Sequence, residues 1–205
     1  MGQKRSGNKG RCPSCKLNNN LCLCESIRPL KIATNVSLIV HVRELTLTSN
    51  TAQFVEKLLP DNASISIRGQ MDINFQTGPI LERPGRPLFL YPHDDALELN
   101  EEFKKNFPGP YHLIVPDGNW QGARNVRRRE AGFKDLPAVK LPPGIMTEYG
   151  LRKAPQPDWL STFEAVTHAL GILESHEITE HMMVFFRLWV KTTFFNRTKD
   201  KSFLA

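Results

Sequence analysis

The sequence predicts an α/β fold with a mostly parallel sheet, because strand-like apolar runs alternate with helical patterns from residue 28 onward. These runs are rich in Val, Ile and Leu, which is typical of strands covered on both faces of a parallel sheet. A length of 205 residues and 40% hydrophobic content suit one ordinary domain with a small appendage. The predicted strands are 36–42, 87–92, 111–116 and 138–141, with a weaker, more alternating candidate at 63–68.

Five helices are predicted between and after these strands. The first begins at Ser49 or Asn50 and ends at Pro60, and the fourth opens with Ser161 and Glu164 in a capping-box pattern. Met and aromatic side chains form a stripe on the fifth, and we interpret that stripe as core. The predicted helices are 49–60, 95–107, 120–133, 160–176 and 178–192.

Charge and targeting signals bound the function. A net charge of +6 with a pI near 9.3 permits binding to a polyanion but does not require it. The basic N-terminus has no apolar stretch behind it, and the longest apolar block carries Arg187, so neither a secretory signal nor a membrane span is predicted. We expect a cytoplasmic protein whose oligomeric state is open, with a monomer preferred.

All four cysteines lie close together in the pattern C-x2-C-x6-C-x-C. Four thiolates at this spacing can close a tetrahedral Zn²⁺ site, although the final C-x-C is unusual for a zinc ribbon. Four reduced thiols, or two transient disulfides, are the alternatives. The sequence therefore predicts a basic tail and four-cysteine zinc module at 1–27, a catalytic domain at 28–195 and a basic C-terminal tail at 196–205. The metal-ligating candidates are Cys12, Cys15, Cys22 and Cys24.

Polar clusters follow three of the predicted strands, at residues 41–44, 91–95 and 117–120. In open α/β sheets, ligands bind outside the carboxyl ends of the strands. Any one of these clusters could be ordinary loop chemistry, but three at one edge of the sheet predict a site. His93, Asp94 and Asp95 are its weaker candidates, and Asp95 alternatively caps the next helix.

Five segments, in order, resemble the DTW-domain family, which is similar to tRNA-uridine aminocarboxypropyltransferases. They are "CPSCKLNNNLCLC", "HVRE…SNT", "LYPHDDA", "PDGNWQGARNV" and "LRKAPQPDWLSTFEA", and they cover the chain from Cys12 to about Leu173. The resemblance implies a SPOUT-like fold with a C-terminal knot. It also implies transfer of the 3-amino-3-carboxypropyl group of S-adenosylmethionine to N3 of a uridine in tRNA, with release of methylthioadenosine.

Two positions depart from the family pattern. Asn119 stands where the family has Thr in D-G-T-W, and Val42 replaces the Pro of H-P-x-E. An amide still donates and accepts hydrogen bonds, but its reach differs from that of a hydroxyl. Neither change removes a catalytic group.

Asp117 is the predicted base for the uridine N3 proton, because it stands at the carboxyl end of a strand. On composition alone an Asp-Gly pair would be a turn, and the family resemblance reverses that preference. Trp120 either stacks on a base or anchors the next helix. The carboxylate of the cofactor suits the helix start at Ser161 and Thr162, where Ser161 and Glu164 can also act only as caps. The predicted cofactor-binding residues are Leu90, Tyr91, Pro92, Asp117, Gly118, Asn119, Leu141, Leu151, Ser161, Thr162 and Glu164.

A run of arginines in the helix after Asp117 is predicted to bind RNA phosphates. Arg124, Arg127 and Arg128 share a helical face, and a solvated surface is the alternative. His41, His112 and His168 lack metal-ligand spacing and are interpreted as packing or loop residues. The predicted RNA-binding residues are Arg43, Arg124, Arg127, Arg128, Arg152 and Lys153.

Three rival functions remain open: an RNA methyltransferase that uses S-adenosylmethionine, a zinc-containing RNA-binding protein without catalysis, and a related transferase acting on ribosomal RNA. Methylthioadenosine as the by-product would separate the transferase from the methyltransferase. The sequence does not indicate which tRNA or which uridine is modified.

Overall fold

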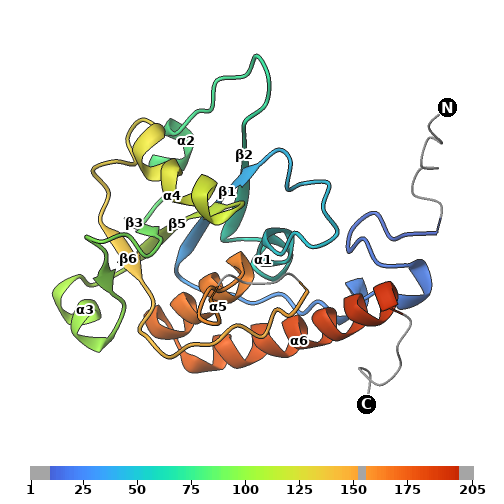
Figure 1. Ribbon diagram of the computed structural model, residues 1–205. Coiled ribbons are helices and arrows are strands. Elements are labelled where there is room, and N and C mark those ends of the chain that lie inside the picture. The colour runs from blue at the N-terminus through green and yellow to red at the C-terminus, as the bar shows by residue number, and fades with distance from the viewer. Residues whose placement is uncertain (1–9, 152–155, 199–205) are drawn as a thin grey trace.

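A six-stranded sheet in which every pair of neighbours is parallel forms the centre of the protein (Figure 1). The computed structural model describes residues 10–151 and 156–198, apart from the side chain of Trp120. The predicted α/β class is confirmed, and the sheet is parallel throughout. In the order β2-β1-β5-β3-β6-β4, the strands are Ala63–Arg68, Asn35–His41, Tyr111–Asp117, Arg86–Leu90, Ala138–Lys140 and Leu97–Glu98.

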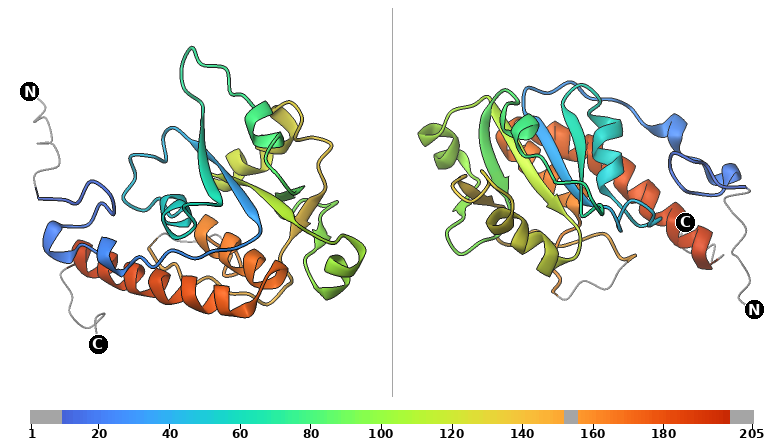
Figure 2. Two further views of the ribbon diagram at one scale, coloured as in Figure 1. Left: turned by 180° about the vertical axis from the view of Figure 1, so that it is seen from behind. Right: turned by 90° about the horizontal axis from the view of Figure 1, so that it is seen from above.

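Helices cover both faces of this sheet (Figures 1 and 2). Alternation along β1 divides the core, because Leu38 and Val40 pack with the side of α1, α5 and α6, whereas Ile39 packs with α2 and α4. Burial on both faces explains the continuous apolar character of the strands. The helices are α1 Ala52–Leu58, α2 Gly78–Leu81, α3 Glu101–Asn106, α4 Trp120–Arg129, α5 Thr162–Leu173 and α6 His176–Thr198.

The prediction of one helix over 95–107 is wrong. Residues 97 and 98 form the edge strand β4, and α3 begins only after Asn100, whose side chain accepts a hydrogen bond from the Phe103 amide at 2.8 Å. Asn100 is thus the N-cap, and Asp95 is not. The short helix α2 was not predicted, and α6 extends beyond both ends of the predicted 178–192.

The Met and aromatic stripe on α6 is core, as predicted. Met182, Phe186 and Trp189 are buried, and Phe186 stacks on Phe163 of α5 with ring centroids 5.0 Å apart. On the opposite side of the helix, Val184 and Leu188 are exposed. The interpretation of His112 as a packing residue is also confirmed: it is fully buried on β5, and its Nε2 lies 2.8 Å from Ser37 Oγ.

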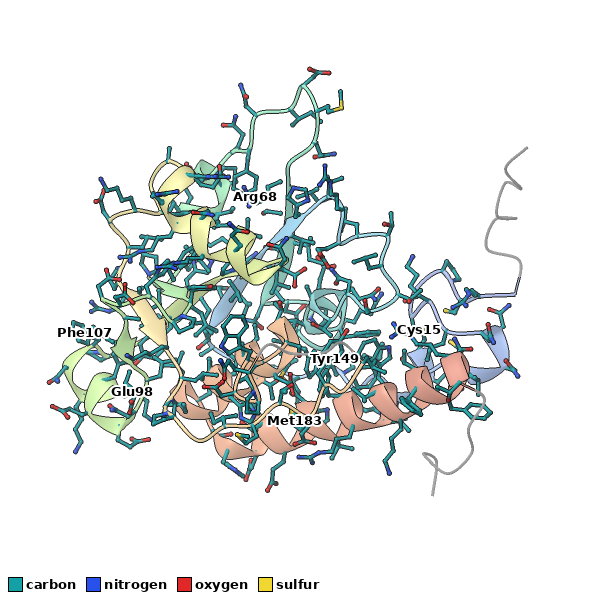
Figure 3. All side chains as sticks on the ribbon, viewed as in Figure 1. Cys15, Arg68, Glu98, Phe107, Tyr149 and Met183 are labelled. Carbon is teal, nitrogen blue, oxygen red and sulfur yellow. The ribbon has the colours of Figure 1, made fainter. Side chains whose placement is uncertain are left out.

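The cysteine-rich segment lies beside the C-terminal end of α6 (Figures 1 and 2; Cys15 is labelled in Figure 3). It contains two short 3-10 helices, η1 Asn19–Leu21 and η2 Cys24–Ser26. Cys15 and Leu17 are buried and belong to the same hydrophobic cluster as α1 and α6. The segment is therefore packed against the α/β core.

Candidate functional site

A cavity of about 500 Å³ opens at the carboxyl ends of β1, β3, β5 and β6 and at the beginning of α5. Its volume lies within the range of sites that bind small molecules and cofactors. Apolar walls come from Leu90, Val115 and Leu141, and polar groups come from the chain after β5 and from the start of α5. The carboxyl ends of these strands therefore lie around one cavity, as the sequence predicts.

Asp117 is buried at the last position of β5, with 8% of its surface exposed. Its Oδ2 accepts a hydrogen bond from Asn50 Nδ2 at 3.0 Å, and its Oδ1 accepts one from Thr162 Oγ1 at 2.5 Å. Thr162 is the first residue of α5, so the carboxylate also lies at the positive end of that helix. Hydrogen bonds to a carboxylate favour its charged form and fix its orientation.

Two further residues beside Asp117 were not predicted as site residues. Asn50 is buried, and its Oδ1 accepts a hydrogen bond from the Gln53 amide at 3.2 Å, which fixes the side chain at the beginning of α1. Thr51 is also buried, and its Oγ1 accepts a hydrogen bond from the Phe163 amide at 3.3 Å. Both belong to the segment "SNT", which the sequence indicated as a helix cap and as part of a family motif, without a role for either residue. Their role depends on contacts with residues far along the chain.

The turn after β5 explains the departure at position 119. Asn119 is the N-cap of α4, because its Oδ1 accepts a hydrogen bond from the Gly122 amide at 2.7 Å. Thr serves as an N-cap through the same kind of acceptor oxygen, so Asn preserves this local role. Gly118, one residue earlier, has φ of 151°, a backbone conformation that other residues rarely adopt.

The capping box predicted at the start of α5 is present. Ser161 Oγ accepts from the Glu164 amide at 3.3 Å, and the Glu164 carboxylate accepts from the Ser161 amide at 2.7 Å. Glu164 is fully buried and also accepts hydrogen bonds from the Thr147 hydroxyl and the Glu148 amide. It therefore holds the loop before α5 against that helix.

Tyr149 connects this loop to the core (labelled in Figure 3). Its ring stacks on Trp189 of α6 at 6.1 Å between centroids and 9° between planes, and its hydroxyl donates to the Ser49 carbonyl at 2.6 Å. Tyr149 lines the cavity, although sequence reasoning did not single it out. Its contact with Ser49 joins residues that are 100 positions apart.

The structure brings most of the predicted cofactor-binding residues into one cavity. Leu151 and Glu164 are the exceptions among the predicted residues that the structure describes, since neither lines it. The side chain of Trp120, which was predicted to stack on a base or to anchor the next helix, lies outside the described part of the structure. The predicted residues that line the cavity are Leu90, Tyr91, Pro92, Asp117, Gly118, Asn119, Leu141, Ser161 and Thr162.

The predicted RNA-binding arginines have different environments. Arg127 is largely buried, forms a salt bridge with Asp95 at 2.8 Å, and donates to the Leu136 carbonyl at 2.7 Å. By contrast, Arg43, Arg124 and Arg128 are exposed. Arg152 and Lys153 lie outside the described residues.

The charges of these arginines also act on a neighbouring histidine. Burial and then the charge of Arg127 lower the pKa of His93. This shift favours the neutral imidazole in the loop after β3, where His93 does not itself line the cavity.

The four cysteines form a compact sulfur cluster whose Sγ atoms all lie within 4.8 Å of one another. Cys12 and Cys24 are 3.6 Å apart, and Cys15 and Cys22 are 3.7 Å apart. Sulfur atoms at Zn–S bond lengths of about 2.3 Å in a tetrahedron lie about 3.8 Å from one another, whereas a disulfide requires about 2 Å. Hydrogen bonding from the Cys15 backbone lowers the pKa of Cys12 to about 6, which favours a thiolate there, whereas burial raises the pKa of Cys15. The donor set fits a four-sulfur metal site.

Within the described ranges, no helix is long and apolar enough to cross a membrane.

Comparisons with known proteins agree with the motifs described above. Residues 9–194 match the model of the DTW domain. The chain is 27% identical over 180 residues to tRNA-uridine aminocarboxypropyltransferase 2 of Mus musculus, covering 84% of this chain and 59% of that protein. It is 26% identical over 172 residues to tRNA-uridine aminocarboxypropyltransferase 2 of Drosophila melanogaster (82% and 68%), and 27% identical over 190 residues to tRNA-uridine aminocarboxypropyltransferase A of Arabidopsis thaliana (80% and 72%).

The match therefore spans about three-fifths of the mouse protein. No solved structure gives a significant match. Since the family model covers residues 9–194, which is most of the chain, the chain belongs to the DTW domain family.

Proposed function

We propose that this protein transfers the 3-amino-3-carboxypropyl group of S-adenosylmethionine to N3 of a uridine in tRNA. The observation that carries this proposal is the buried Asp117 carboxylate, held by Asn50 and Thr162 at a cavity of about 500 Å³. Membership of the DTW domain family and the names of the relatives supply the substrate class. S-adenosylmethionine supplies an electrophilic carbon next to its sulfonium.

Asp117 acts as the general base in this proposal. Its carboxylate takes the N3 proton, and N3 forms a bond to the carbon whose bond to sulfur breaks. The electron pair of that bond stays on sulfur, so the products are the N3-substituted uridine and neutral methylthioadenosine. A carboxylate oxygen can accept more than one hydrogen bond, and the contacts from Asn50 and Thr162 fix the orientation of this carboxylate.

The cavity suits the two ends of the co-substrate. Leu90, Tyr91 and Leu141 offer a largely apolar wall for the adenosine. At the start of α5, the Phe163 and Glu164 amides are used by Thr51 and Ser161, and the helix still presents its positive end. We therefore assign the carboxylate of the transferred group to this helix start. Leu151 and Glu164 support the cavity from outside in this assignment.

The exposed Arg43, Arg124 and Arg128 are proposed to contact RNA phosphates near the cavity. Arg127 has a different role, because Asp95 and the Leu136 carbonyl already occupy its guanidinium. Arg152, Lys153 and the stacking role of Trp120 stay predictions. The SPOUT-like knot and the three-part domain division do so as well.

We also propose that the four cysteines bind a structural Zn²⁺. With four protein sulfurs as ligands, such an ion keeps no open position and holds the segment in shape. Metal analysis of the purified protein checks this assignment. About one zinc per chain, lost in Cys22→Ser, is the expected result.

The decisive experiment incubates the protein with S-adenosylmethionine and tRNA and follows both products by mass spectrometry. We expect an aminocarboxypropyl mass gain on the tRNA and methylthioadenosine in solution. Asp117→Ala should abolish both, and Asp61→Asn, which changes an exposed aspartate away from the cavity, should not.

Each rival function gives a different result in this assay. S-adenosylhomocysteine in place of methylthioadenosine would establish a methyltransferase instead. A product formed when ribosomal RNA replaces tRNA, and none with tRNA, would establish the related transferase. Binding of tRNA with no product would identify a non-catalytic RNA-binding protein.

A further inference from the structure

A second cavity, of about 240 Å³, lies where the cysteine-rich segment meets the C-terminal end of α6. Figures 1 and 2 show these two parts of the chain side by side. Three segments that are distant in sequence build its wall: the turn that holds Cys12 and Cys15, the loop after β1, and the last turns of α6. The lining residues are Arg11, Lys16, Thr48, Thr193, Asn196 and Arg197, together with Leu17.

The charge of this cavity has one sign. Arg11, Lys16 and Arg197 are cationic, and no acidic residue is among the described residues that line it. Backbone carbonyls hold both arginines in place, because Arg11 Nη1 donates to the Lys16 carbonyl at 3.0 Å and Arg197 Nη1 donates to the Leu151 carbonyl at 3.2 Å. A guanidinium held in this way keeps further N–H groups for a ligand. Three cations around a small hollow favour an anion.

Two buried polar atoms in the wall lack a hydrogen-bond partner within the described part of the chain. They are the Thr193 hydroxyl oxygen and the Asn196 amide oxygen. Thr193 is only 2% exposed, and buried polar atoms in folded proteins are nearly always hydrogen-bonded. A hydroxyl can donate to an anion, and rotation of the Asn196 amide exchanges its oxygen for an NH₂ donor. The arrangement is that of a binding site for an oxyanion.

The second cavity, named the basic cavity for its three cations, lies next to the cavity that contains Asp117. The cavity around Asp117 is the proposed catalytic cavity, and a short loop joins the two. Thr48 lines the basic cavity, whereas Ser49 and Asn50 line the catalytic cavity. Arg197 Nη2 lies 3.5 Å from Thr48 Oγ1, and Asn50 donates to Asp117. An anion bound by Arg197 is therefore connected to the proposed base through three consecutive residues.

We propose that this basic cavity binds a phosphodiester group of the substrate RNA and so sets the position of the uridine in the catalytic cavity. The identity of the RNA rests on the proposed function, but the anion site rests on its own residues. Contacts to phosphates fix the register of a nucleic acid, while contacts to a base select it. In this arrangement the cysteine cluster has a structural role, because it shapes the turn that carries Arg11 and Lys16 into the wall of the cavity.

The test measures binding of tRNA by fluorescence anisotropy over a series of salt concentrations. Arg197→Gln removes one cation, and Lys16→Asn removes a second one at a position whose φ of 63° suits Asn. Lys191→Gln is the matched control, since it removes an exposed charge from the same helix outside the cavity. Thermal unfolding confirms that each variant is folded.

Loss of one phosphate contact should reduce the slope of log K against log salt by about 0.7 to 0.9. The corresponding loss of affinity for tRNA at 0.1 M salt is about tenfold. We expect this result for Arg197→Gln and for Lys16→Asn, with the KM for S-adenosylmethionine unchanged and with wild-type behaviour of Lys191→Gln. Equal slopes and affinities in wild type, Arg197→Gln and Lys16→Asn would overturn the proposal.

A competition with inorganic phosphate separates RNA from a free anion as the ligand. Phosphate that binds the wild type at this site but leaves the tRNA slope identical in the variants would contradict an RNA phosphodiester. The outcome is also separable from that of the proposed function. If the wild type modifies tRNA while the variants bind tRNA normally, only the proposed phosphate site is wrong. If tRNA binding depends on Arg197 but no product forms, only the proposed transferase activity is wrong.

Discussion

The proposed catalytic cavity around Asp117 and the proposed anion site in the basic cavity differ in how their polar groups are satisfied. In the catalytic cavity both oxygens of Asp117 already accept hydrogen bonds, from Asn50 and Thr162. In the basic cavity, the Thr193 hydroxyl has no partner among the described residues, and cations line the wall. Partner residues thus already orient the proposed base, whereas in the basic cavity the proposed anion would supply the missing partner.

This difference suits two tasks. A general base must hold a fixed position and charge state, since small displacements from productive geometry are costly to catalysis. A phosphate site gains affinity from charge and tolerates variation in sequence, because every nucleotide carries a phosphate. We therefore expect changes in the first cavity to alter the rate of transfer and changes in the second to alter the binding of RNA.

The largest expected effect follows from Asp117→Asn. The amide keeps the shape of the carboxylate and can still meet Asn50 and Thr162, but it cannot take a proton. We expect the rate of transfer to fall by about 10²- to 10⁴-fold. Single-turnover product formation at saturating tRNA is the measurement, with Asp61→Asn as control, and a rate within about threefold of wild type would exclude Asp117 as the base.

Glu164→Ala should produce the next largest effect, on stability. The substitution leaves the Ser161 and Glu148 amides and the Thr147 hydroxyl without their buried acceptor. Each unsatisfied group costs about 1 to 3 kcal/mol, so the free energy of unfolding should fall by about 4 kcal/mol. Chemical denaturation measures this change, and Glu82→Ala, at an exposed position, should cost little. An equally small effect at Glu164 would show that the wall of the catalytic cavity does not depend on it.

A pH effect of comparable size is expected from His112, which is buried in β5 and lines neither cavity. Burial, with a smaller contribution from the charge of Arg83, lowers its pKa from 6.5 to about 4, so the unfolded chain binds more protons than the folded one between these values. Its contribution is complete above about pH 6.5 and is lost as the pH falls toward about 4, with a loss of about 3 kcal/mol. Unfolding measured across this range should show a shallower pH dependence for His112→Gln than for wild type. Parallel curves would contradict the assignment.

Removal of the proposed metal should have a smaller effect, which weakens the binding of tRNA but not that of S-adenosylmethionine. A chelator should loosen the turn that carries Arg11 and Lys16, while the catalytic cavity, built from the strand ends and α5, stays intact. We expect affinity for tRNA to fall about tenfold, as for loss of one phosphate contact, with calorimetric binding of S-adenosylmethionine unchanged. Loss of both would show that the two cavities are not independent.

Asn119→Thr should have the smallest effect. The Thr hydroxyl can accept from the Gly122 amide as Asn119 does, and exchanges between N-cap residues change stability by less than about 1 kcal/mol. Thermal unfolding and the transfer rate should both stay near those of wild type. A rate change greater than about tenfold would show that position 119 contacts the substrates directly.

Local signals in the sequence predicted much of the fold and part of the site. Continuous apolar runs indicated the parallel strands, and Ser161 with Glu164 indicated the start of α5. The strand end placed Asp117 at the ligand side of the sheet, but only the resemblance to the DTW-domain family made it the predicted base rather than a turn residue. These features depend on a residue and its near neighbours, which a sequence displays directly.

The remaining features depend on contacts between distant segments. Asn50 could be assigned to the site only from its hydrogen bond to Asp117, which is 67 positions away in the sequence. Tyr149 likewise depends on its hydrogen bond to the Ser49 carbonyl. Arg127 shares the charge of Arg124 but is neutralised by Asp95 on another segment. Residues 95–107 have an amphipathic pattern that predicted a single helix. In the structure this segment contains the edge strand β4, and the helix α3 begins after its N-cap Asn100.

The most direct test of the division between the cavities compares the transfer rates of Asp117→Asn and Arg197→Gln over a titration of tRNA. Saturating tRNA should restore Arg197→Gln to about the wild-type kcat, because only the KM for tRNA is raised. Asp117→Asn should stay slow at every tRNA concentration. If saturating tRNA rescues Asp117→Asn, or fails to rescue folded Arg197→Gln, the proposed separation of proton transfer from RNA positioning is wrong.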